Sequence, residues 1–129
     1  MTVTFDPYDR MIMVQAKITG PAGSLFSLAA LDTGATMSFV NTELLEMLNY
    51  DLTKASEFPT MPLLTANGVI FAPQITLDGF YALEKDKRSF PVLFYKMPAT
   101  SPVDAIIGLD FLRSHILTLD FTTGQLTLV

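Results

Sequence analysis

Cysteine is absent from this sequence of 129 residues, and histidine occurs once, as His115. Disulfide bridges and thiolate metal sites are therefore excluded. A lone histidine has no second imidazole or thiolate with which to bind a metal ion, so we assign His115 a structural or surface role. We expect no metal and no cofactor. The lack of cysteine is compatible with a reducing, cytoplasmic compartment.

Positive charge is scarce as well. Eight lysines and arginines stand against thirteen aspartates and glutamates, which gives a net charge of −5. A protein that binds phosphate backbones needs a basic surface, and these few cations are scattered along the chain. We therefore expect no nucleic-acid partner.

The sequence also lacks long hydrophobic runs. No uninterrupted apolar stretch approaches the roughly 20 residues that a membrane helix needs. The first residues have neither a basic start nor an apolar core of signal-peptide length. These absences predict a protein that does not cross a membrane and stays in the cytoplasm.

Apolar residues are nevertheless plentiful. They make up 50% of the chain, charged residues make up 16%, and the mean hydropathy is +0.39. We interpret residues 1–129 as one domain, because no linker or low-complexity tract interrupts them. A small domain cannot bury that much apolar surface alone, so we expect a sizeable subunit interface.

A carboxylate follows an apolar segment in the stretch Ala-Ala-Leu-Asp-Thr-Gly-Ala-Thr, residues 29–36. Asp32 should lie where a buried strand ends, and Gly34 lets the backbone turn and leaves room for a ligand beside the acid. An acid in such a place is costly unless it has a partner or a function. The alternative is an ordinary turn, because Asp, Thr and Gly are all common turn formers.

A second motif, Val-Asp-Ala-Ile-Ile-Gly-Leu-Asp-Phe-Leu at residues 103–112, is an apolar strand that ends in Gly108 and leads into a short helix. The two motifs, in this order, resemble those of the retropepsin-like aspartic proteases. The resemblance covers nearly the whole chain. It is closest to small single-domain bacterial members and to the protease domain of the ubiquitin-shuttling protein Ddi.

This resemblance implies an all-β, single-lobe acid-protease barrel with one or two short helices. It also implies an aspartic endopeptidase whose catalytic motif is Asp32, Thr33 and Gly34. Such chemistry needs two carboxylates that share one proton, and the chain has no second Asp-Thr-Gly or Asp-Ser-Gly. We therefore expect a homodimer in which Asp32 of each subunit faces the other and Thr33 hydrogen-bonds across the two-fold axis.

The substrate of such an enzyme is a peptide or protein, held under a hairpin called the flap. Asn67-Gly68 between two apolar segments is a strong signal for a tight hairpin over residues 63–71. A purely structural hairpin is the alternative. The residues that we expect to contact substrate are Ala35, Thr36, Asn67, Gly68, Val69, Ile70 and Ile107.

Two features depart from the retroviral members of this family. Only Gly68 marks the tip of the flap, which is usually richer in glycine. Thr36 and Leu109 stand where the retroviral enzymes commonly carry an acid and an arginine that form an ion pair. Because both positions are uncharged here, no lone buried charge is left, and the interface should be packed differently.

Hydrophobic periodicity and turn residues predict the other elements. We expect strands at 2–5, 11–18, 25–31, 38–40, 74–77, 80–83, 90–95, 116–121 and 125–129, with helices at 42–48 and 111–114. Asn41 should cap the first helix, and Asp78-Gly79 should form a tight turn. The charged run 84–88 is interpreted as a solvated loop or edge, and Asp110 as a cap or local partner of the second helix.

A function of another class is a non-catalytic dimerisation or peptide-binding module that keeps the same fold. A pure scaffold has no physical reason to keep facing carboxylates, because like charges repel each other. The intact Asp-Thr-Gly motif therefore favours the enzyme.

Overall fold

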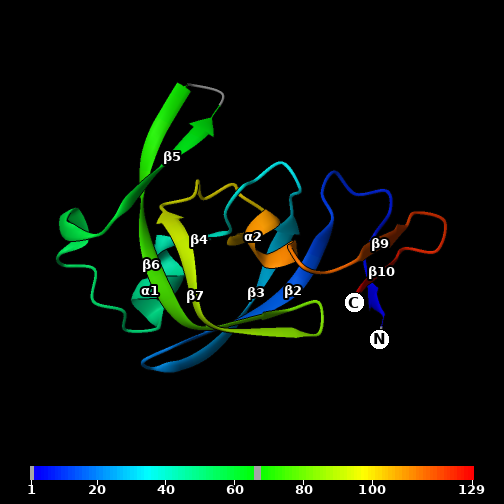
Figure 1. Cartoon of the computed structure of the whole chain (residues 1–129), viewed down its shortest axis with the longest axis horizontal. Coiled ribbons are helices and arrows are strands. Elements are labelled where there is room, and N and C mark those ends of the chain that lie inside the picture. Colours follow the sequence, from blue (N-terminus) through cyan, green and yellow to red (C-terminus); the bar gives the residue numbers. More distant parts are fainter. Residues whose placement is uncertain (1, 66–67) are drawn as a thin grey trace.

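The computed structural model describes residues 2–65 and 68–129, and most of these residues lie in β-strands (Figure 1). The helical segments are α1 (Thr42–Met47), the 3-10 turn η1 (Ala55–Glu57) and α2 (Leu109–Leu112). The strands are β1 (Val3–Thr4), β2 (Met13–Gly20), β3 (Gly23–Leu31), β4 (Phe39–Asn41), β5 (Thr60–Thr65), β6 (Gly68–Ala82), β7 (Lys85–Tyr95), β8 (Ala105–Ile107), β9 (Leu117–Asp120) and β10 (Gln125–Leu128).

The larger sheet closes on itself. Its strand order is β2-β3-β8-β4-β7-β6-β5, and an additional pairing of β2 with β6 joins the first six strands into a barrel. A smaller sheet, in the order β1-β10-β9, lies at the end of the molecule where the two termini are found (Figure 1). The expected all-β barrel with two short helices is confirmed.

The first hairpin of the barrel forms because its residues alternate. Along β2, Val14, Ala16 and Ile18 are buried, and the residues between them face outward or are only partly covered. Gly20 pairs with Gly23 across the turn into β3. The predicted hairpin that leads to Asp32 is therefore present, and β3 ends at Leu31, directly before the acid.

Three phenylalanines attach α2 to the barrel. The ring centroids of Phe80 in β6, Phe90 in β7 and Phe111 in α2 lie 5.6 to 5.8 Å from one another, in tilted or edge-to-face arrangements. Aromatic pairs in such geometries add stability beyond the area that they bury. This cluster fixes α2, and therefore also fixes Gly108 at its N-terminus.

Helix α1 begins as its cap residue predicts. The side chain of Asn41 accepts a hydrogen bond from the N–H of Glu43, and Leu44 and Leu45 are buried. Helix α2 covers Leu109–Leu112, so it begins and ends two residues earlier than the predicted range 111–114. The main chain is extended at Gly108, directly before the helix, and leaves the helical conformation at Arg113, whose ψ is 147°.

The predicted tight turn at Asp78-Gly79 is wrong. Strand β6 runs through both residues, and the chain turns instead at Leu83 and Glu84, which have φ angles of 54° and 63°. Gly79 pairs with Thr19 of β2 on one side and with β7 on the other. A Cβ at this glycine would lie 3.3 Å from the Cβ of Thr19, so the glycine permits close packing of strands instead of a turn.

His115 contacts a cation. Its Nε2 lies 2.8 Å from Nζ of Lys87, whose ammonium also lies over the ring of Phe111. Burial lowers the pKa of His115, and the charges of Lys87 and Lys85 lower it further. Because the folded pKa lies below the unfolded one, the unfolded chain binds more protons as the pH falls, and His115 reduces the stability of the fold in acid.

We expect an NMR titration to give a pKa for His115 below its ordinary value of 6.5. Lys87→Met, which removes the charge but can still cover the Phe111 ring, should move this pKa upward. A wild-type pKa at or above the ordinary value, or no response to the substitution, would show that the contact does not persist in solution.

Candidate active site

Asp32 lies at the ends of two parallel strands. Leu31 of β3 pairs with Ile107 of β8, and the N–H of Asp32 donates to the carbonyl of Ile107 at 2.9 Å. The two sequence motifs, at residues 29–36 and 103–112, therefore meet side by side. Asp32 itself is exposed.

The turn after Asp32 orients its carboxylate. The N–H of Gly34 donates to Oδ1 of Asp32 at 2.8 Å, and the N–H of Ala35 donates to the Asp32 carbonyl at 3.2 Å. A Cβ at Gly34 would lie only 3.1 Å from Oδ1, so a larger residue would crowd the carboxylate. Thr33 is exposed, and its side chain makes no hydrogen bond within residues 2–65 and 68–129.

Gly108 allows the second motif to approach the first. A Cβ at this position would lie 2.7 Å from the carbonyl oxygen of Ala35 and 2.9 Å from that of Met37. The N–H of Leu109 donates to the same Ala35 carbonyl at 2.8 Å. Main chain therefore packs directly on main chain, and only glycine leaves enough space.

A cavity of about 510 Å³ opens beside Asp32. Its floor and walls come from the turn after β3, from β4 and β7, and from β5. The described residues that line it are Asp32, Gly34, Ala35, Thr36, Met37, Phe39, Met61, Pro62, Leu63 and Leu93. Most of these side chains are apolar, and Asp32 is the one acid among them.

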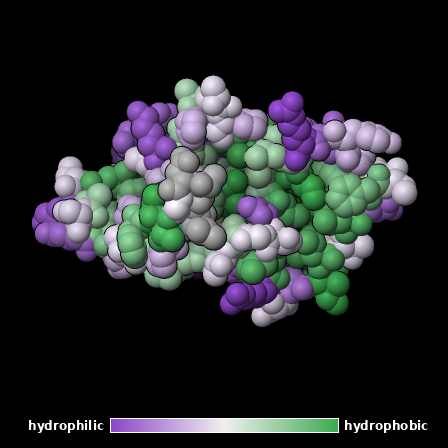
Figure 2. Space-filling model, turned by 90° about the horizontal axis from the view of Figure 1, so that it is seen from above, coloured by the Kyte–Doolittle hydropathy of each residue, from purple (hydrophilic) through white to green (hydrophobic). Residues whose placement is uncertain are grey.

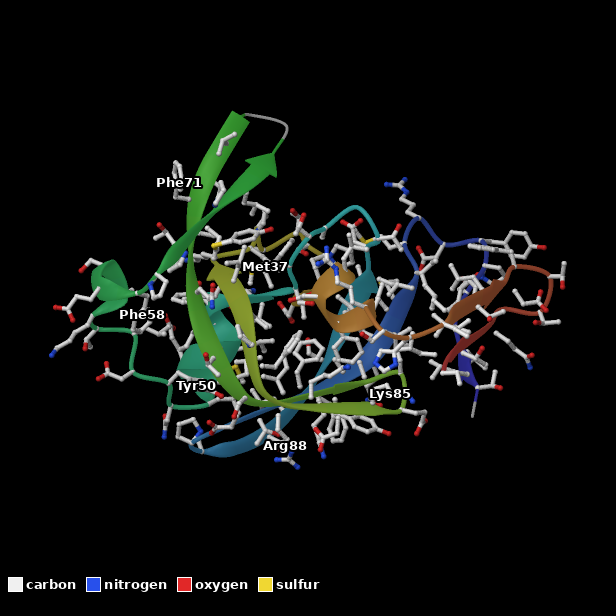
Figure 3. All side chains as sticks on the ribbon, in the orientation of Figure 1. Met37, Tyr50, Phe58, Phe71, Lys85 and Arg88 are labelled. Carbon is white, nitrogen blue, oxygen red and sulfur yellow. The ribbon has the colours of Figure 1, made fainter. Side chains whose placement is uncertain are left out.

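A hairpin covers one side of this cavity. Residues 60–65 of β5 pair with residues 68–73 of β6, and together they project from the barrel (Figure 1). We refer to these paired segments as the arm. Met61, Pro62 and Leu63 of the arm line the cavity. In Figure 3, Met37 lies between the arm and α2, whereas Phe71 points away from the barrel and is 69% exposed.

Residues 14–111 match the family model described as Aspartyl protease. The chain belongs to this family. The protease is also similar in structure to a retropepsin-like aspartic protease from Rickettsia conorii, with a TM-score of 0.68 and 19% sequence identity over 99% of this chain and 88% of that chain. At 19% sequence identity, this similarity is evidence for a shared fold alone. No curated protein matches the chain.

The structure brings four of the predicted site residues of the protease to the cavity, namely Asp32, Gly34, Ala35 and Thr36. Thr33 lies beside them on the surface. Ile107 lies elsewhere: its side chain is completely buried in the core, and only its carbonyl reaches the site, where it accepts from Asp32.

Three of the predicted flap residues, Gly68, Val69 and Ile70, lie on the arm. Val69 and Ile70 are 57% and 42% exposed and do not line the cavity as it stands. Gly68 begins β6 with a φ of +111°, a conformation that favours glycine. Asn67 lies outside the described residues. The predicted hairpin is confirmed by the pairing of Thr65 with Gly68, and it extends further in both directions than residues 63–71.

Sequence reasoning missed six apolar residues that line the cavity: Met37, Phe39, Met61, Pro62, Leu63 and Leu93. For Met61 a signal was available, because Met61 and Leu63 alternate on one side of a strand that leads into the Asn-Gly turn. For Leu93 there was none. It reaches the site because β7 pairs in parallel with β4, where Leu93 lies opposite Phe39.

The described part of the protease contains no group of three or more His, Asp or Glu side chains that could hold a metal ion. No helix within residues 2–65 and 68–129 is long and apolar enough to cross a membrane.

Proposed function

We propose that this protein is an aspartic endopeptidase that acts as a homodimer, with one Asp32 from each subunit forming the catalytic pair. The observation that carries this proposal is the exposed carboxylate of Asp32, oriented by the Gly34 N–H at the edge of an apolar cavity. Membership of the aspartyl protease family supports the same chemistry.

The mechanism uses the two carboxylates differently. The ionised one removes a proton from water, which attacks the carbonyl carbon of the peptide bond, and the protonated one hydrogen-bonds to the carbonyl oxygen. The proton then passes to the leaving nitrogen as the C–N bond breaks. Asp32 is the single acid among the described residues that line the cavity, so a second subunit must supply the other carboxylate.

The surface beside the site favours such a partner. Figure 2 looks onto the side of the molecule from which the arm projects, and hydrophobic residues cover much of its right-hand part, over the end that carries β1, β9 and β10. Directly beside the ends of β9 and β10, Ile116, Phe121 and Val129 are 70%, 53% and 72% exposed. Exposed apolar patches of this kind mark protein interfaces. The Thr33 side chain has no hydrogen-bond partner among the described residues, so it is available to hydrogen-bond across the axis.

We expect the rate of cleavage to follow the concentration of dimer. Well above the dissociation constant, activity per chain should be constant, because nearly all chains are paired. Well below it, total activity should fall as the square of protein concentration, about a hundredfold for each tenfold dilution. The measurement is a dilution series on a peptide mixture with cleavage read by mass spectrometry, beside sedimentation of the same samples.

A strictly linear dilution series that continues into a range where sedimentation shows only monomer would contradict the shared site. A dimer that binds peptides and cleaves none of them, under conditions where the Asp32 turn is intact, would favour the non-catalytic binding module.

A further inference from the structure

Ser38 connects the wall of the cavity to the rest of the molecule. It is completely buried, and both of its neighbours in the chain, Met37 and Phe39, line the cavity. Its carbonyl accepts a hydrogen bond from the N–H of Leu93, another cavity residue, at 3.0 Å. A change at Ser38 therefore reaches three of the side chains that would contact a substrate.

The other polar groups of Ser38 are joined to α2, through Asp110. Oδ1 of Asp110 accepts from the Ser38 N–H at 2.9 Å and from the Ser38 hydroxyl at 2.7 Å. The hydroxyl oxygen in turn accepts from the N–H of Gly108 at 2.9 Å. Ser38 thus donates twice and accepts once within a single network, which joins the segment after the first motif to the second motif.

The two oxygens of the Asp110 carboxylate differ in their hydrogen bonding. Oδ1 takes a third hydrogen bond, from the N–H of Phe111 at 2.9 Å. Oδ2 is buried and has no hydrogen-bond partner among the residues that the structure describes. Burying an unpartnered carboxylate oxygen costs stability, so an acid at this place needs a compensating role. Three donors that converge on one oxygen are typical of a charged acceptor, whose hydrogen bonds are stronger than neutral ones.

We propose that Asp110 and Ser38 are a pair of positioning residues that hold the cavity wall at residues 37–39 and so set which substrate side chain the protease accepts. This inference rests on the proposed endopeptidase function. The cluster formed by Phe80, Phe90 and Phe111 holds α2 on the barrel. Because Asp110 of α2 is hydrogen-bonded to Ser38, the chain neighbours of Ser38, Met37 and Phe39, are held in place as well. Neither residue is placed in contact with the substrate.

The test compares Ser38→Ala, Asp110→Ala and the double variant. Each single variant should lower kcat/KM by about 10- to 100-fold, because a shift of about 1 Å in a positioning element has effects of this size. The double variant should lose no more than the worse single variant, since both substitutions break the same link. Asp110→Asn keeps an acceptor oxygen for Ser38 and should restore most of the activity.

A purely structural role is distinguished by two peptides that differ only in the size of one apolar side chain next to the cleaved bond. Loss of folded enzyme lowers kcat/KM equally for both peptides, whereas a displaced wall changes their ratio. Asp104→Ala is the matched control, because it removes another partly buried acid, which accepts from Asn41 at 3.0 Å and does not line the cavity. It should leave the ratio unchanged.

Hydrogen exchange at the Gly108 N–H gives a readout that needs no activity. Its acceptor is the Ser38 hydroxyl, so Ser38→Ala should speed its exchange while the Asp104→Ala control does not. A wild-type chain that cleaves neither peptide would contradict the proposed function, and this exchange measurement would still test the link itself. Additive losses in the double variant, an unchanged peptide ratio, or unchanged exchange at Gly108 would overturn the positioning role.

Discussion

Asp32→Asn is expected to abolish peptide cleavage and leave the fold intact. The amide cannot serve as the ionised base that removes a proton from water, and a general base contributes about 10²- to 10⁴-fold to a rate. The side-chain oxygen of Asn can still accept from the Gly34 N–H, which donates to Oδ1 in the parent, so the turn should keep its shape. The measurement is the initial rate on a peptide mixture, with circular dichroism as the check on folding.

Mixing wild-type and variant chains tests whether the two subunits share one catalytic pair. When wild-type chains are mixed with an excess of Asp32→Asn chains, most wild-type chains enter mixed dimers that carry one catalytic carboxylate. Activity should then fall well below that of the same amount of wild-type protein alone. A variant that cleaves as well as the parent, with contamination excluded, would remove Asp32 from the mechanism, and a mixture without suppression would remove the shared pair.

The two motifs and the elements that hold them could be predicted from the sequence because their signals are local. Asn41 caps α1 with its own side chain, and the Asn67-Gly68 pair needs only a few flanking residues to indicate a hairpin. The resemblance then placed one residue of each motif, Asp32 and Ile107, in a single site. The hydrogen bond from the N–H of Asp32 to the Ile107 carbonyl does join the two motifs, but the side chain of Ile107 is buried in the core.

Errors and omissions occurred where distant segments decide the outcome. Asp78-Gly79 has the composition of a turn, but strands on both sides of Gly79 hold it extended. The local partner predicted for Asp110 is confirmed in the N–H of Phe111, yet its contacts with Ser38 span 72 positions and have no local signal. The pairing of a partly buried acid with a buried hydroxyl becomes visible only once α2 and the turn after Asp32 lie side by side.

Gly108→Ala tests this meeting of the two motifs most directly. The φ of Gly108 is −102°, which any residue adopts, so the backbone conformation does not require glycine. Space does. The added Cβ would lie 2.7 Å from the Ala35 carbonyl oxygen and 2.9 Å from the carbonyl carbon and oxygen of Met37, all of them main-chain atoms that no side-chain rotation can move. The turn after Asp32 or the start of α2 has to shift.

We expect Gly108→Ala to lower kcat/KM by at least about 100-fold, the cost of moving a catalytic group by about 1 Å, and to destabilise the fold by about 1–3 kcal/mol as other overpacked sites do. Gly20→Ala is the matched control: its Cβ would overlap the ring of Tyr50, at the far end of β2 from the site. It should lose stability while each folded molecule keeps its activity. Rates are therefore divided by the folded fraction from a urea titration. If Gly108→Ala then resembles Gly20→Ala, the close approach of the two motifs serves the fold alone, and the position of Asp32 depends on its own turn.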